Sequence, residues 1–333
     1  MSSRKITIII PTFNRSQTIE RTLQSVVNQT HTDWECLVID DGSTDHTKEV
    51  VKTWSAKDER IQCLERPNNR KKGANACRNV GIEKSSGAYL MFLDSDDTIA
   101  NTCFENRLKY FSENNKADAL IFSTQEKKGD TLGDIVNRDP ENPTSRAYLE
   151  MFLSYEIPWQ ISSPIWKKEA FTKGGKFDEN LMRFQDVDFH THMLLSGCEV
   201  KRIEEADFFY HTDDAHDKFH DETFIAKAME AVRYYLKKYD RSKLEGTLSA
   251  QERRSFLRKM FLRALRRFVH DRNRPKLYKE FTRLAWNTRI FSRKECWYLS
   301  LLRRMDKHQL QDKPGFGFYR LNKFLLSRIF PSN

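Results

Sequence analysis

The sequence predicts an α/β protein in which a mostly parallel sheet carries helices on both faces and is followed by a mainly α-helical extension. Three observations support this prediction. Short apolar runs alternate with helical patterns through the first third of the chain, an order typical of parallel sheets. Polar clusters come directly after three of these apolar runs. Residues 225–333 hold 28 Lys and Arg against 9 Asp and Glu, and parts of this stretch have the apolar spacing of helices.

The first strand is expected at residues 5–10 (KITIII), a β-branched run that ends at Pro11. Ser16 can cap a helix, because the apolar residues that follow it recur at helical spacing, at Ile19, Leu23, Val26 and Val27. Residues 35–40 (ECLVID) form the next buried strand. The alternation continues with helices at 44–54, 75–84 and 104–114 and strands at 61–65, 89–93 and 119–123. Residues 127–146 are polar and contain Gly and Pro, which predicts a loop or insertion.

Composition narrows the class of protein. With 38% hydrophobic and 31% charged residues among 333, the chain resembles ordinary globular proteins and can form one large domain with an appendage. No run reaches the roughly 20 apolar residues of a membrane span, and residues 1–5 lead into a strand without a signal-peptide core. We therefore expect a cytoplasmic protein, either free or bound peripherally to the inner face of the cell membrane. The six cysteines are scattered, which indicates neither a disulfide framework nor a zinc site.

Polar clusters follow three strands of the predicted sheet, at residues 12–14, 40–43 and 94–97. The carboxyl ends of parallel strands meet at one edge of a sheet, where ligands bind in this class of fold. In the third cluster, Asp94, Asp96 and Asp97 lie so close together that their charges need a cation or protons. Oxygen ligands of this kind suit Mg²⁺ or Mn²⁺, which often also bind diphosphate oxygens. The alternative is that the segment only caps the next helix in a solvated loop.

Over about residues 4–215 the sequence resembles the glycosyltransferase family 2 enzymes of the GT-A fold. The motifs that carry the resemblance are IIIPTFNR (8–15), LVIDDGSTD (37–45), ACRNVGI (76–82), FLDSDD (92–97), GGKFDE (174–179) and QDVDF (185–189). The resemblance implies a GT-A domain at residues 1–224, with a donor half at about 4–125 and an acceptor half at about 145–224. Residues 225–333 are then the basic helical extension.

The resemblance also implies the roles of individual residues. The residues expected to bind the nucleotide-sugar are Pro11, Thr12, Asn14, Asp41, Arg78, Asn79, Asp94 and Ser95, with Asp41 accepting a hydrogen bond from the base. Asp96 is the expected ligand of Mn²⁺ or Mg²⁺, and His211 or His216 is a candidate for a further metal contact. For each of these residues a purely structural role is the alternative.

Asp186 is expected to be the catalytic base that takes the proton of the acceptor hydroxyl. Asp188 is the alternative base, although on a helix it points about 200° away from Asp186. Where relatives have Glu, this chain has Gln185, which alters contacts with the acceptor. Trp159 and Trp166 are candidate stacking surfaces for acceptor sugars, with core packing as the alternative. One base without a matched nucleophile implies a single displacement that inverts the anomeric centre.

The expected activity is therefore metal-dependent transfer of a sugar, from a UDP-sugar by the family's habits, to a saccharide or lipid-linked acceptor in surface polysaccharide or glycan synthesis. A sugar nucleotidyltransferase is disfavoured because residues 6–15 contain no glycine. A degenerate protein that binds anions or nucleic acid is the other alternative.

The basic extension is expected to meet an anionic membrane through residues 252–330 or to pack on the catalytic domain, and nucleic acid is the least favoured partner. For the membrane case, the apolar stripe would be Leu257, Phe261, Leu262, Leu265 and Phe268. The sequence leaves a homo-oligomer open.

Overall fold

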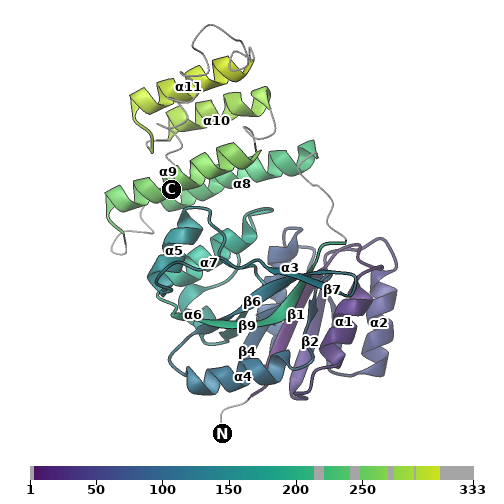
Figure 1. Ribbon diagram of the computed structural model, residues 1–333. Helices are drawn as coiled ribbons and strands as arrows, with labels where there is room; N and C mark the ends of the chain where they lie inside the picture. Colours follow the sequence, from purple (N-terminus) through teal and green to yellow (C-terminus); the bar gives the residue numbers. More distant parts are fainter. Residues whose placement is uncertain (1–3, 214–220, 241–247, 269–273, 289, 308–333) are drawn as a thin grey trace. The chain divides into compact units, whose positions relative to one another are not determined.

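The computed structural model describes residues 4–213, 221–240, 248–268, 274–288 and 290–307. The chain forms two compact units (Figure 1). The first consists of Met1–Phe152 and Ile157–Asp217, and the second of Leu153–Glu156 and Lys218–Asn333. The division near residue 218 precedes helix α8 (Glu222–Asp240), whereas the boundary predicted after residue 224 falls inside that helix.

The first unit is built on a nine-stranded sheet of described residues with the order β3-β2-β1-β4-β8-β6-β9-β5, and β7 pairs with β6. The strands are β1 (Ile6–Thr12), β2 (Trp34–Asp40), β3 (Ile61–Glu65), β4 (Tyr89–Phe92), β5 (Thr98–Ile99), β6 (Ala119–Lys128), β7 (Thr131–Ile135), β8 (Pro164–Lys167) and β9 (Val200–His211). Strands β3, β2, β1 and β4 are parallel neighbours. Strand β8 lies antiparallel between β4 and β6. The sheet is therefore mixed: four parallel strands lie in the predicted donor half, and β6 and β9 form a further parallel pair.

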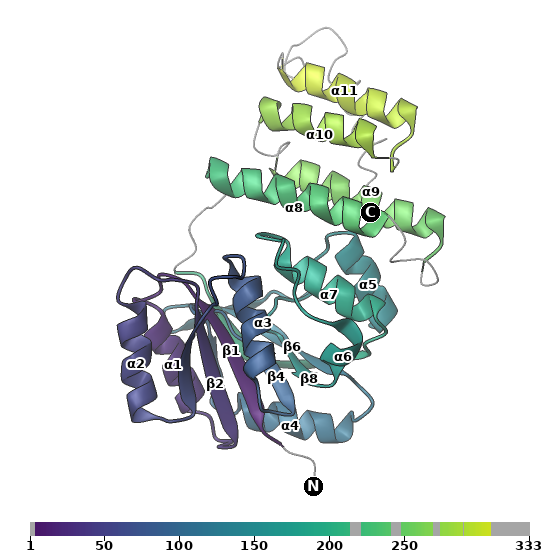
Figure 2. The same cartoon turned by 180° about the vertical axis from the view of Figure 1, so that it is seen from behind.

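Helices cover both faces of this sheet. They are α1 (Ile19–Val27), α2 (Thr47–Lys57), α3 (Ala74–Lys84), α4 (Cys103–Glu113), α5 (Ser145–Leu153), α6 (Ala170–Gly174) and α7 (Gln185–Leu195). Ile6, Ile8 and Ile10 of β1 enter the apolar core that α1, α2 and α4 share. Ile9 points to the opposite face, where α3 lies against β1 and β2 (Figure 2). A methyl group at Gly81 of α3 would overlap the Ile9 side chain, so glycine permits this close packing.

The predicted alternation of strands and helices is confirmed, and the ends of these elements differ from the predicted ones by only a few residues, except for β6. The main difference lies in residues 127–146, for which the sequence predicts a loop or insertion without strands of its own. Strands β6 and β7 form a hairpin there, and every residue of β7 is exposed. Because no face of β7 is buried, its sequence TLGDI lacks the alternation of apolar and polar residues that would have predicted a strand.

The second unit is helical, with α8 (Glu222–Asp240), α9 (Ala250–Phe268), α10 (Pro275–Asn287) and α11 (Arg293–Lys307) among its described residues. The apolar stripe of α9 is buried rather than presented to a membrane. Phe261 packs against Phe281 and Phe291 with ring centroids 5.2 and 4.9 Å apart, and Phe268 stacks on Tyr155. Of the two alternatives for this stripe, the membrane-facing one is therefore wrong. None of the described helices is long and apolar enough to span a membrane.

Candidate active site

Hydrogen bonds hold the loop after β1 against the segment that follows β2. The backbone N–H of Asp41 donates to the carbonyl of Thr12 at 2.9 Å. Asn14 adopts a left-handed conformation with φ of 53°, which lets its backbone N–H donate to Ser43 Oγ at 2.9 Å. The Asn14 side-chain oxygen in turn accepts from the backbone N–H of Thr44 at 2.9 Å. Asn14 therefore holds the second polar cluster against the first.

The same loop also reaches the acidic cluster after β4. Arg15 forms an ion pair with Asp96, with 3.3 Å between nitrogen and oxygen. Thr18 Oγ1 donates to the carbonyl of Ser95 at 3.0 Å, and Arg21 donates to the carbonyl of Asp96 at 2.5 Å. The three polar clusters consequently meet, as their positions at the strand ends predict.

Asp41 is held by two donors from the protein. Arg66 Nε donates to one of its carboxylate oxygens, and the backbone N–H of Gly73 donates to the other at 2.8 Å. Arg66 is 9% exposed and also donates to the carbonyls of Pro67 and Arg70. Sequence reasoning missed Arg66, because a lone arginine in a loop gives no signal of its own. The predicted contact between Asp41 and a nucleobase stays a prediction.

The three carboxylates of the acidic cluster have different environments. The side chains of Asp94 and Asp96 are 42% and 30% exposed, whereas Asp97 is 3% exposed. Burial raises the pKa of Asp97 well above its usual value, and repulsion from Asp94 and Asp96 raises it further. Asp97 Oδ1 accepts a hydrogen bond from the backbone N–H of His211 at 3.1 Å, which partly offsets this rise. Asp94 and Asp96 are thus the accessible pair.

His211 lies at the end of β9, beside the acidic cluster. Its ring Nε2 is 2.9 Å from Thr98 Oγ1, and the residue is 8% exposed. The ring therefore bonds to a strand residue, and a metal contact by His211 stays a prediction. His216, the other histidine considered for this role, lies outside the described residues.

Arg78 connects the acidic cluster to helix α7. Its guanidinium donates to Asp94 Oδ1 at 2.8 Å and to Gln185 Oε1 at 3.2 Å. The residue is only 3% exposed, and its guanidinium carbon lies 5.4 Å from the centre of the Phe177 ring. A buried guanidinium thus holds the end of β4 close to the first residue of α7.

Asp186, the second residue of α7, carries a carboxylate with an unusual pKa. Burial raises the pKa to about 6, and the attraction of Arg78 opposes this rise while the repulsion of Asp94 adds to it. A backbone hydrogen bond from Ile161 also favours the charged form. Asp186 is partly exposed, whereas Asp188 is 2% exposed. Of the two candidate bases, Asp186 is therefore the one that an acceptor could reach.

His190 lies one helical turn after Asp186 and supports it from inside the protein. Its ring Nδ1 is 2.8 Å from the Asp186 carbonyl oxygen, and its ring stacks on Phe152 with centroids 4.9 Å apart. Burial lowers the pKa of His190 to about 3, so the ring is neutral near pH 7. A neutral ring that donates from Nδ1 to the carbonyl is the arrangement that fits this geometry.

The structure corrects the expected roles of two tryptophans. Trp159 and Trp166 are 2% and 0% exposed, so neither ring offers a face to an acceptor sugar. Both belong to an aromatic cluster of the first unit that also contains Tyr148, Phe152, Phe171, Phe189 and His190. Such apolar rings stabilise the core of the predicted acceptor half. Sequence position alone had not distinguished a buried aromatic ring from an exposed one.

The remaining predicted residues take part in local contacts. The Asn79 side chain bonds to the backbone of Phe177 through both ends of its amide, at 3.0 and 2.9 Å, and so anchors the loop before α7. Gln185 accepts from Arg78. Pro11 and Ser95 are buried beside the meeting strand ends. The contacts of Asn79, Gln185, Pro11 and Ser95 with a substrate stay predictions.

A divalent ion could be held by Asp94 and Asp96. The part of the chain that the structure describes has no group of three or more His, Cys, Asp or Glu side chains arranged to hold a metal. Mg²⁺ and Mn²⁺ are nevertheless often bound by one or two carboxylates together with phosphate oxygens of a substrate. Two accessible carboxylates whose charges repel each other therefore suit an ion that arrives with a diphosphate.

Comparison with known proteins gives a family and a fold. Residues 7–168 match the family model of glycosyl transferase family 2. An uncharacterized glycosyltransferase of Rickettsia bellii is 44% identical over 119 residues, which are 36% of this chain and 16% of the relative. The GalNAc(5)-diNAcBac-PP-undecaprenol β-1,3-glucosyltransferase of Campylobacter jejuni is 36% identical over 109 residues, 33% of this chain and 35% of the relative. The chain thus spans a minor part of these curated relatives.

A solved structure supports the fold of a larger part of the chain. TarS 1–349 of S. aureus, in complex with UDP-GlcNAc, aligns with a TM-score of 0.62 at 18% sequence identity. The alignment covers 91% of this chain and 87% of that structure. At this identity the likeness concerns the fold alone, and it confirms the predicted GT-A architecture with its helical extension.

Proposed function

Because the chain belongs to glycosyl transferase family 2 through its residues 7–168, we propose that it is an inverting glycosyltransferase. It moves a sugar from a nucleoside-diphosphate sugar to a hydroxyl of a saccharide or lipid-linked acceptor. The observation that carries the proposal is the contact of Arg78 with both Asp94 and Gln185. This contact brings the carboxylates that suit a diphosphate-bound ion close to Asp186, the carboxylate that suits an acceptor hydroxyl.

The donor's nucleoside lies in this proposal beside the loop that follows β1. Thr12 Oγ1 is buried and has no hydrogen-bond partner among the described residues, so it can bind a polar group of a ligand. Asp41, positioned by Arg66 and Gly73, is the acceptor for the base. UDP is our preferred nucleotide, and the complex of TarS with UDP-GlcNAc supports the choice only by likeness of fold.

Asp94 and Asp96 hold Mn²⁺ or Mg²⁺ in this proposal, and the ion, when bound, neutralises charge on the leaving diphosphate. Arg15 pairs with Asp96 and Arg78 with Asp94, so each carboxylate already lies beside a positive charge. These ion pairs fix the positions of the two carboxylates after β4. Arg15, 41% exposed at its side chain, is also free to turn towards a phosphate.

Asp186 acts as the general base. With a pKa of about 6 it is mostly ionised near pH 7, and it is a stronger base than an ordinary aspartate. The acceptor oxygen attacks the anomeric carbon while the bond from that carbon to the diphosphate oxygen breaks. The electron pair of the broken bond leaves with the diphosphate, and the hydroxyl proton passes to Asp186. One displacement of this kind inverts the anomeric centre.

One of the relatives suggests the acceptor class. The Campylobacter jejuni relative acts, by its name, on a saccharide linked to undecaprenol diphosphate. We include lipid-linked saccharides among the acceptors for that reason, and a site of action at the inner face of the membrane follows from such an acceptor.

Calorimetric titration of the full chain with UDP-GlcNAc and UDP, with and without Mn²⁺, tests the proposal. Nucleotide binding should require Mn²⁺ and should be lost in the Asp96→Ala variant, because the ion then keeps only one of its two accessible carboxylate ligands. Asp45→Ala is the matched control, since Asp45 binds the N–H groups of Ser16 and Thr47 outside the acidic cluster. Equal affinity of Asp96→Ala and the wild type would remove Asp96 from the site.

A further inference from the structure

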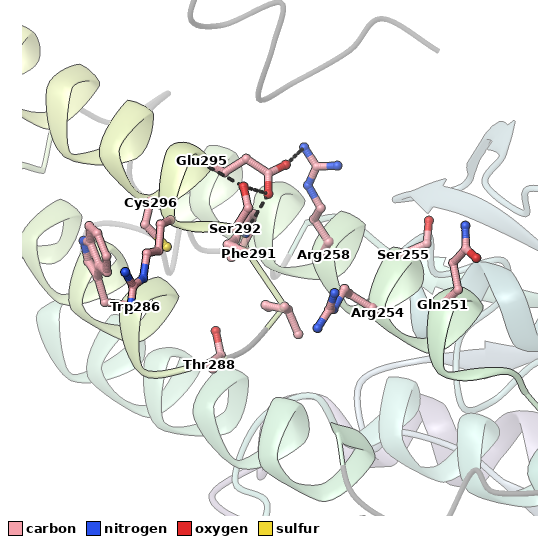
Figure 3. A pocket seen from close by; sticks show the side chains of 12 residues that line it. Gln251, Arg254, Ser255, Arg258, Trp286, Thr288, Phe291, Ser292, Glu295 and Cys296 are labelled. Atoms are coloured by element: carbon pink, nitrogen blue, oxygen red, sulfur yellow. Dashed lines mark hydrogen bonds and ion pairs between the residues drawn. The ribbon is translucent and has the colours of Figure 1, made fainter.

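A cavity of about 990 Å³ lies in the second unit, between α9 and the turn that connects α10 to α11 (Figure 3). Arg254 and Arg258 line it from α9, Trp286 from the end of α10, and Arg293 and Glu295 from the start of α11. Its volume is near the upper end of the range of small-molecule sites, roughly 300–1,000 Å³. The cavity contains none of the residues placed in the proposed transfer site.

The single acidic residue of the lining is already neutralised. Glu295 forms an ion pair with Arg258 at 2.5 Å. It also accepts from the backbone N–H and the hydroxyl of Ser292, each at 2.8 Å, and thereby caps the first turn of α11. Figure 3 shows Arg258 turned towards Glu295 and Arg254 turned away from it. The charges of Arg258 and Glu295 cancel each other, so this pair adds no net charge to the cavity.

Arg254 and Arg293 supply the remaining charge. Both side chains are exposed, and neither guanidinium group has a hydrogen bond or ion pair to any residue that the structure describes. The lining thus carries two uncompensated guanidinium groups, which favour an anionic ligand. Guanidinium groups bind phosphate with paired, charge-assisted hydrogen bonds.

The apolar part of the lining is formed by Ile290, Phe291 and Trp286, beside the polar side chains of Gln251, Ser255 and Thr288. Ile290 and Phe291 are 3% and 8% exposed. Trp286 is 51% exposed, and its indole N–H donates to Ser300 Oγ at 3.3 Å, which holds the ring while leaving much of its surface open. Indole rings favour positions between water and the apolar part of a lipid. The ligand that fits joins a phosphate to an apolar body.

Two other occupants fit less well. Residues 308–333 of this chain carry four Lys and Arg against one Asp, so their charge does not complement two arginines. A nucleic acid presents a row of phosphates and is usually bound by a row of cations along a groove. Here two free cations lie beside an apolar wall instead.

We infer that this cavity binds the phosphate group of a lipid-like amphiphile, with Arg254 and Arg293 on the phosphate and Trp286 beside the apolar chain. The inference does not depend on sugar transfer, because it concerns a separate cavity and a different ligand. It would assign a specific lipid-phosphate site to the basic extension, in place of a diffuse electrostatic attraction.

The test uses soluble probes and the full-length chain. Hexyl phosphate and inorganic phosphate are titrated calorimetrically into the wild type, the Arg254→Ala/Arg293→Ala variant and the Lys259→Ala/Arg283→Ala control. The control removes the same charge from exposed positions of α9 and α10 outside the cavity. Hexyl phosphate should bind the arginine variant about tenfold or more weakly than the wild type, and the control within about twofold. Thermal unfolding of each variant verifies that it is folded.

The role of the apolar wall needs one further variant. Trp286→Ala should weaken the binding of hexyl phosphate and leave that of inorganic phosphate unchanged. The fraction of protein that cosediments with vesicles of phosphatidylglycerol in phosphatidylcholine should likewise fall more in the arginine variant than in the control.

Three results would overturn the inference. Equal losses in the arginine variant and the control would reduce the site to diffuse attraction. Inorganic phosphate binding as tightly as hexyl phosphate would indicate a free phosphate as the ligand. Binding of duplex DNA that depends on Arg254 and Arg293, without any binding of hexyl phosphate, would indicate nucleic acid instead.

Discussion

Replacing Asp186 with Asn should slow sugar transfer and at the same time stabilise the protein at neutral pH. The folded protein raises the pKa of Asp186 from 3.8 to about 6, a change of about two units, and each unit corresponds to about 1.4 kcal/mol. An ionised Asp186 therefore lowers the free energy of unfolding by about 2–3 kcal/mol relative to a neutral side chain. Asn has nearly the shape of a neutral Asp side chain and carries no charge, so the variant avoids this cost.

The sign of the effect depends on pH. Because the folded pKa is raised, the wild type loses stability as pH rises from about 4 to about 6, and the loss is complete above that range. The advantage of Asp186→Asn should therefore be absent near pH 4 and reach its full size near pH 7. Urea unfolding at both pH values measures it. In the Asp186→Asn variant, kcat should also fall by about 10²–10⁴-fold, since the general base is lost.

Asp188→Asn is the matched control, because it removes a neighbouring carboxylate of the same helix that is only 2% exposed. It should not reproduce both the gain in stability and the loss of kcat. If the Asp186→Asn variant unfolded more easily than the wild type at pH 7, Asp186 would be a structural carboxylate and the reasoning would fail. Wild-type turnover in that variant would place the base elsewhere.

Three further predictions concern Arg78, Arg66 and Gly81. In the wild type, kcat should fall about tenfold per pH unit below about pH 6. The Arg78→Met variant should show this fall at higher pH, because the guanidinium lowers the pKa of Asp186. An unchanged pH profile of kcat would contradict the role of Asp186 as the base. Arg66→Met should weaken UDP binding about tenfold in calorimetry, since Asp41 loses a charged partner, and unchanged affinity would remove Arg66 from the site. Gly81→Ala should lower the urea-unfolding free energy by about 1–3 kcal/mol through overpacking, unless α3 shifts to accept the methyl group.

Much of the fold could be predicted because the donor half obeys simple local rules. Runs such as residues 5–10 are mostly apolar, since β1 is buried on both faces, and such runs are easily distinguished from amphipathic helices. Strand β7 could not be predicted, because all its residues are exposed and no core selects its pattern. Strand β8 is only four residues long, which is too short for a periodic signal.

The candidate site was predictable where it follows strand ends and unpredictable where it depends on tertiary neighbours. Asp94 and Asp96 follow an apolar strand, and this position alone indicates a ligand site. Arg66 comes from a loop, and its contact with Asp41 spans 25 positions of the sequence, which no local pattern reveals. The burial of Trp159 and Trp166 likewise depends on His190 and Phe152, which lie elsewhere in the sequence.

The position of Arg78 and Asp94 beside Asp186 makes donor binding and proton binding reciprocal. Asp94 raises the pKa of Asp186, so a cation that neutralises Asp94 lowers that pKa. Thermodynamic linkage then requires that ionised Asp186 increases the affinity for the same cation by an equal factor. A metal-bound donor would thus bind more tightly as pH rises through 6, and its arrival would increase the fraction of Asp186 that is ionised. The coupling therefore favours the basic form of Asp186 in the donor complex.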